Sequence, residues 1–76
     1  MKELVVVLAK AIVDQPEAVS VAEHEEEDGT LILELSVSPD DVGKVIGRQG
    51  RVIKAIRMVA KAAAAKEGRK VAVEVV

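Results

Sequence analysis

The sequence predicts an α+β fold with the element order helix, strand, strand, helix, helix, strand. Apolar residues recur every three or four positions in an opening stretch and in a long later one, which is typical of amphipathic helices. Apolar and polar residues alternate in three other stretches, which is typical of half-buried strands. Two glycines then separate a short helical pattern from the long one.

The first half of the chain predicts one helix followed by a β-hairpin. The helix covers Lys2–Asp14 and ends before Pro16, which cannot continue it. Its apolar face consists of Leu4, Val5, Leu8, Ile12 and Val13. The strands cover Ala18–His24 and Thr30–Val37, and Asp28-Gly29 between them suits the turn of an antiparallel hairpin. The core-facing residues of the second strand are Leu31, Leu33, Leu35 and Val37.

The second half predicts two helices and a last strand. A short helix over Pro39–Ile46 begins at Ser38, a favoured N-cap residue. A longer helix covers Arg51–Lys66 and ends at Gly68, before a strand over Arg69–Val76. The long helix has an apolar face of Val52, Ile56, Val59, Ala60 and Ala63. Nearly opposite lies a basic face of Lys54, Arg57 and Lys61.

Length and composition restrict what the chain can be. Residues 1-76 are expected to form a single domain with a small core. Half of the residues are apolar and none is aromatic, which excludes a nucleic-acid reader that stacks bases on Phe, Tyr or Trp. The absence of cysteine excludes disulfides and fits the cytoplasm. The apolar run Leu4–Ala9 is too short and too closely flanked by charges to span a membrane.

The acidic and histidine side chains do not predict an active site. Asp40 and Asp41 lie in the first turn of the predicted short helix, where the helix dipole favours carboxylates. Capping therefore explains them better than an acid–base dyad or a metal site. His24 is the only histidine and has no cysteine or tyrosine to act with. We expect no enzyme, no metal and no cofactor.

The glycines at positions 47 and 50 define a candidate phosphate-binding turn. Gly47 is expected to end the short helix in a left-handed conformation, and Gly50 to stand where the long helix begins. Arg48 and Gln49 then form the tip of the turn. The first N–H groups of the long helix point outward, with the positive end of the helix dipole behind them. This turn is predicted to seat a phosphate group.

The charges are divided unequally along the chain. The net charge is −2, but residues 1–41 carry two basic and eleven acidic residues, which gives −9. Residues 42–76 carry nine basic and two acidic residues, which gives +7. The basic half contains the glycine turn. Such an asymmetry indicates contact with nucleic acid, although two differently solvated faces explain it as well.

The run from Val45 to Ile56, Val-Ile-Gly-Arg-Gln-Gly-Arg-Val-Ile-Lys-Ala-Ile, closely resembles the signature of KH domains. In that family a GxxG loop clamps about four nucleotides of single-stranded backbone. The order of elements is similar to the bacterial, type II arrangement, and the whole chain resembles the KH domain-containing protein A family. The resemblance implies a three-stranded sheet packed on one side by three helices, with the GxxG loop between the second and third helices.

The resemblance also implies that the ligand is single-stranded RNA. Its backbone is expected to approach the two glycines, while amides of the loop and of Arg51 donate to phosphate oxygens. The bases are expected in an apolar groove formed by Val45, Ile46, and Val52 or Ile53 beside an edge of the sheet. The expected RNA-binding residues are Lys44, Val45, Ile46, Gly47, Arg48, Gln49, Gly50, Arg51, Ile53 and Lys54.

Partners and cellular role are also expected from the resemblance. One such domain neutralises few phosphates and binds weakly, and linked sites raise the effective affinity. Family members pair with a second KH-containing protein. We therefore expect a homodimer, or a heterodimer with a second KH-containing RNA-binding protein, that acts in the cytoplasm as a post-transcriptional regulator or RNA chaperone, with no membrane partner.

Two other classes of protein fit part of the sequence. A helix-turn-helix DNA-binding module would use Gly47 to Gly50 as its turn and the helix from Arg51 in the major groove. It leaves three strands unexplained, and the helix start lacks the usual base-reading side chains. A structural dimerisation module would pair through the valine-rich last strand and would not depend on the loop.

Overall fold

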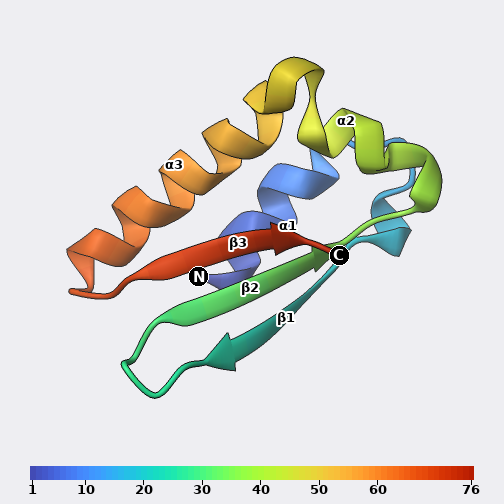
Figure 1. The fold of residues 1–76 in the computed structure, drawn as a ribbon. Coiled ribbons are helices and arrows are strands. Elements are labelled where there is room, and N and C mark those ends of the chain that lie inside the picture. The colour runs from blue at the N-terminus through green and yellow to red at the C-terminus, as the bar shows by residue number, and fades with distance from the viewer.

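The computed structural model describes residues 1–76 and confirms the α+β fold, with a three-stranded sheet and three α-helices packed on one side of it (Figure 1). The helices are α1 (Lys2–Lys10), α2 (Val42–Ile46) and α3 (Arg51–Lys66). The strands are β1 (Ser20–Glu25), β2 (Leu31–Ser36) and β3 (Val71–Val75). Single 3₁₀ turns cover Pro16–Ala18, Pro39–Asp41 and Arg48–Gly50. No helix combines the length and apolar character needed to cross a bilayer.

The middle strand, β2, pairs with both of its neighbours. β1 runs antiparallel to β2, with Val21 opposite Leu35, as the Asp28-Gly29 turn predicted. β3 runs parallel to β2, with Val73 opposite Leu33. A parallel pair requires a long crossover, and here the crossover consists of α2, the glycine loop and α3. The glycine loop therefore lies within this crossover, at the junction of α2 and α3 (Figure 1).

The core lies between the sheet and the helices and contains only aliphatic side chains. Leu33 and Leu35 are fully buried, and Leu31 is 6% exposed, so the predicted face of β2 is confirmed. The remaining core residues are Val5, Ala9, Val13, Val21, Val45, Ile53, Ile56, Ala60, Ala64, Val71 and Val73. Short, branched side chains fill the space between the two layers without any aromatic ring.

The first helix and first strand are shorter or shifted relative to the prediction. α1 ends at Lys10 rather than Asp14 because the N–H groups of Asp14 and Gln15 donate to the Asp41 carboxylate instead of to helix carbonyls. Pro16 then begins a 3₁₀ turn, so β1 starts at Ser20 rather than Ala18. Long-range hydrogen bonds, which no local pattern encodes, set the end of α1, whereas the local turn at Pro16–Ala18 sets the start of β1.

The buried face of α3 is rotated relative to the predicted one. Ile56 and Ala60 are buried as predicted, but the face is completed by Ile53 and Ala64. Val59 is 43% exposed, whereas Ile53 is only 4% exposed. The prediction was wrong here because α3 packs against α1, α2 and β3 together, and the position of these partners decides which side of an apolar helix is covered.

Candidate nucleic-acid interface

The glycine loop is a tight turn with three residues at positive φ. Gly47 has φ 77° and ψ 170°, Gln49 has φ 58° and Gly50 has φ 74°. The conformation of Gly47 is not the left-handed helical one that we predicted, but a more extended region open in practice only to glycine. Arg48 and Gln49 are exposed at the tip, as predicted.

The two glycines are required for different reasons. A Cβ at Gly47 would overlap the side chain of Val52 and lie 2.8 Å from the Val52 backbone nitrogen. A Cβ at Gly50 would have nothing closer than Lys54 Cε at 3.8 Å. Glycine at position 47 therefore allows α2 and α3 to pack closely. At position 50 there is room for a side chain, and only the positive φ favours glycine.

Several loop amides that we expected to bind phosphate are already used within the protein. The Gly47 N–H donates to Gly43 O at 2.9 Å, and the Gly50 N–H donates to Gly47 O at 3.1 Å. The Arg51 N–H donates to Arg48 O. These three N–H groups are therefore not free to donate to a phosphate.

The cations around the loop differ in whether they are neutralised. Arg48, Arg51 and Lys54 are exposed and form no ion pair. Lys44 is also exposed, but its Nζ donates to the Asp14 carboxylate. This contact raises the pKa of Lys44, chiefly through the hydrogen bond that Lys44 donates to Asp14. Three free positive charges therefore surround the tip, with a fourth already paired.

The apolar residues predicted to line a groove separate into two groups. Val45 is fully buried and Ile53 is 4% exposed, so both support the loop from beneath rather than form a surface. Ile46 and Val52 are half-buried. Val52 does line an apolar groove of about 370 Å³, but that groove lies between α1 and α3 and not beside the sheet edge. Its lining residues are Leu8, Ile12, Arg51, Val52, Ala55, Ile56 and Val59.

The hollow beside the sheet edge is basic. It lies between α3 and β3, has a volume of about 320 Å³, and is lined by Arg57, Lys61, Val71, Ala72, Val73 and Glu74. Arg57 Nε donates to the Val73 carbonyl oxygen at 2.9 Å. Our site prediction omitted Arg57 and Lys61, although they share the basic face of α3 with Lys54. The sequence pattern that could have identified them is their spacing of three and seven residues from Lys54, which places all three on one face of a helix.

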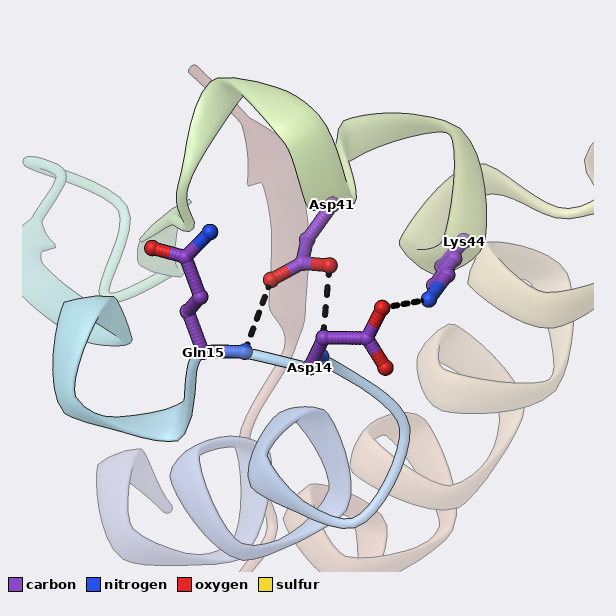
Figure 2. A network of polar contacts seen from close by, with 4 residues as sticks. All are labelled: Asp14, Gln15, Asp41 and Lys44. Atoms are coloured by element: carbon purple, nitrogen blue, oxygen red, sulfur yellow. Dashed lines mark hydrogen bonds and ion pairs between the residues drawn. The ribbon is translucent and has the colours of Figure 1, made fainter.

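Asp41 anchors the helices that carry the loop. Its side chain is 1% exposed, and its two oxygens accept the N–H groups of Asp14 at 3.2 Å and Gln15 at 3.0 Å (Figure 2). Capping does not explain this residue, contrary to our prediction, and Ser38 makes no side-chain cap bond either. No cluster of three His, Cys, Asp or Glu side chains could hold a metal ion. Asp41 instead ties the end of α1 to the start of α2.

Three helices on one side of a mixed sheet, with two of them joined through Gly-x-x-Gly, define a KH domain. Comparison with known proteins agrees with this class. A family model described as KhpA/KhpB, KH domain, matches residues 2–75. The chain belongs to this family, whose domain serves binding rather than catalysis.

Relatives of similar length support the assignment. The chain is 60% identical to the RNA-binding protein KhpA of Clostridium perfringens over 76 residues, which cover all of both chains. It is 54% identical to KhpA of Clostridium acetobutylicum, again over all of both chains. KhpA of Listeria monocytogenes is 43% identical over all of this chain and 99% of its own length.

A solved structure shares the fold. Era in complex with MgGDPNP and nucleotides 1506–1542 of 16S ribosomal RNA superposes with a TM-score of 0.62 at 21% identity. The match covers 97% of this chain and 28% of the Era chain. At this identity the likeness establishes the fold alone.

Proposed function

We propose that this protein binds single-stranded RNA, with the sugar–phosphate backbone lying against Gly47 to Gly50. The observation that carries the proposal is the exposed tip of Arg48 and Gln49 beside the unpaired cations Arg51 and Lys54. Relatives at 43–60% identity are named RNA-binding proteins, which supports the same ligand.

The proposed binding mode separates phosphate contacts from base contacts. Arg48, Arg51 and Lys54 attract the phosphates, since the N–H groups of Gly47, Gly50 and Arg51 are bonded within the protein. The bases extend toward the hollow between α3 and β3, where Arg57 and Lys61 present donors. About three neutralised phosphates, at about −0.7 each for a single strand, give a shallow salt dependence with a slope near −2.

Changing the tip of the loop tests the proposal. Arg48→Asp together with Gln49→Asp is expected to lower affinity for single-stranded RNA at least tenfold, because an attractive phosphate contact becomes a repulsive one. The melting temperature should stay unchanged, because both side chains are exposed. Filter binding and thermal unfolding measure the two quantities.

A matched control lies at the far end of the same helix. Ala65→Asp with Lys66→Asp makes the same change in charge at exposed positions 15 and 16 residues beyond Gly50, and should retain binding within a few-fold. Unchanged RNA affinity of the loop variant contradicts the proposal. Preferential binding of duplex DNA in the same series would favour the helix-turn-helix alternative. The structure weighs against that alternative, because Ile53 and Ile56 of α3 are buried and cannot contact the major groove of DNA.

We also propose that the chain pairs with a second copy or with another KH-containing RNA-binding protein, and acts in the cytoplasm as a post-transcriptional regulator or RNA chaperone. The apolar groove between α1 and α3 supports pairing, because Val59 in its lining is 43% exposed. Burial of such a surface favours association.

Val59→Glu tests the pairing. The substitution puts a charge on the rim of the groove without entering the core, so it should weaken dimerisation at least tenfold while the fold is kept. Sedimentation measures the homodimer, and capture with the tagged chain measures a KH-containing partner. A wild-type chain that is monomeric at high concentration and captures no such partner contradicts the pairing proposal.

A further inference from the structure

Lys44 differs from the other cations at the loop because an acidic side chain of the same protein already holds it. Its Nζ donates to the carboxylate of Asp14, thirty residues earlier in the chain (Figure 2). Lys44 lies on α2, three residues before Gly47, so its backbone is within one helical turn of the loop. Arg48, Arg51 and Lys54 have no such partner.

The backbone that carries the Asp14 carboxylate is held in place by a buried residue. The backbone N–H of Asp14 donates to Asp41 Oδ1 at 3.2 Å, and the N–H of Gln15 donates to Asp41 Oδ2 at 3.0 Å. Asp41 is 1% exposed, which fixes this segment against α2. The side chains of Asp14 and Lys44 remain 71% and 47% exposed, so a ligand can reach the pair.

We propose that Asp14 competes with RNA phosphate for Lys44 and thereby lowers the affinity of the loop for RNA. This inference rests on the proposed function. A carboxylate and a phosphodiester each offer anionic oxygens to an ammonium group, so the Asp14 carboxylate competes with the backbone for the charge of Lys44. The exposed pair is weak enough to exchange in water, and phosphate binding then leaves the Asp14 carboxylate solvated.

Removing the competing charge is expected to strengthen RNA binding. Asp14→Asn keeps the backbone N–H that donates to Asp41, and it frees Lys44. Affinity for a single-stranded oligonucleotide at low salt should rise about three- to fivefold, the range expected when one exposed ion pair no longer has to be broken. The gain should shrink as salt rises, because ions screen exposed charges.

Two further variants separate competition for Lys44 from a general loss of negative charge. Asp40→Asn removes the same charge from an exposed neighbour of Asp41 that does not contact Lys44, and should change affinity less than twofold. Lys44→Ala should abolish the gain, so that the Asp14→Asn/Lys44→Ala double variant binds no more tightly than Lys44→Ala. The Lys44 pKa, followed by NMR without RNA, should fall in Asp14→Asn.

The outcomes distinguish this inference from the function on which it rests. If the Arg48→Asp/Gln49→Asp variant loses binding but Asp14→Asn binds like the wild type, RNA binding stands and the competition is overturned. A gain that persists without Lys44, or that Asp40→Asn reproduces, also overturns it. If the loop variant binds RNA as well as the wild type, the proposed function fails and the inference fails with it.

Discussion

Gly47→Ala is expected to destabilise the protein by about 3 kcal/mol or more. The φ of 77° with ψ of 170° lies in a region that costs an alanine about 1–3 kcal/mol by itself. The new Cβ also overlaps the Val52 side chain and lies 2.8 Å from the Val52 nitrogen, so α2 and α3 must separate. A domain of this size is stabilised by only about 4–11 kcal/mol. Urea unfolding at 25 °C measures the loss.

Gly50→Ala is the matched comparison, because it makes the same chemical change three residues away. Its φ of 74° is strained for alanine, but the nearest atom to the new Cβ is 3.8 Å away. We expect a loss of about 1–2 kcal/mol from the backbone alone. Equal losses at the two glycines contradict the explanation by close packing at Gly47.

Asp41→Asn is expected to cost about 2–3 kcal/mol in the free energy of unfolding. The carboxylate accepts two N–H groups with its two oxygens, and an asparagine offers one acceptor oxygen and one NH₂ group. The NH₂ group would face the second N–H donor at a site that is 1% exposed. A buried donor without a partner keeps its full desolvation cost.

The neighbouring carboxylate is the control for Asp41. Asp40 is exposed and makes no side-chain hydrogen bond or ion pair, so Asp40→Asn should change stability by no more than about 0.5 kcal/mol. Urea unfolding of both variants measures the difference. Similar losses at positions 40 and 41 indicate that the helix dipole, and not the buried anchor, accounts for these aspartates.

Much of the fold follows from local patterns. The alternation of Leu31, Leu33 and Leu35 predicts β2 and its buried face, and the Asp28-Gly29 turn predicts the antiparallel partner. The glycines at 47 and 50 predict where α2 ends and α3 begins. These features are predictable because each depends on the geometry of a few consecutive residues.

The roles of the loop residues are less predictable. Val45 and Ile53 were expected to line a groove, but both are buried in the hydrophobic core. A chain rich in valine, isoleucine and alanine offers several similar apolar faces for one helix. The arrangement of α1, α2 and β3 around α3 selects one of them.

The sequence by itself determined the order of elements, the face of β2 and the position of the basic turn, since propensity and periodicity act over a few residues. Only the tertiary structure decided that Gly47 accommodates Val52, that Asp41 anchors Asp14 and Gln15, and that Lys44 is already paired. The two bonds to Asp41 join residues 27 and 26 positions apart. Contacts at that separation depend on how the whole chain packs, and no local pattern specifies them.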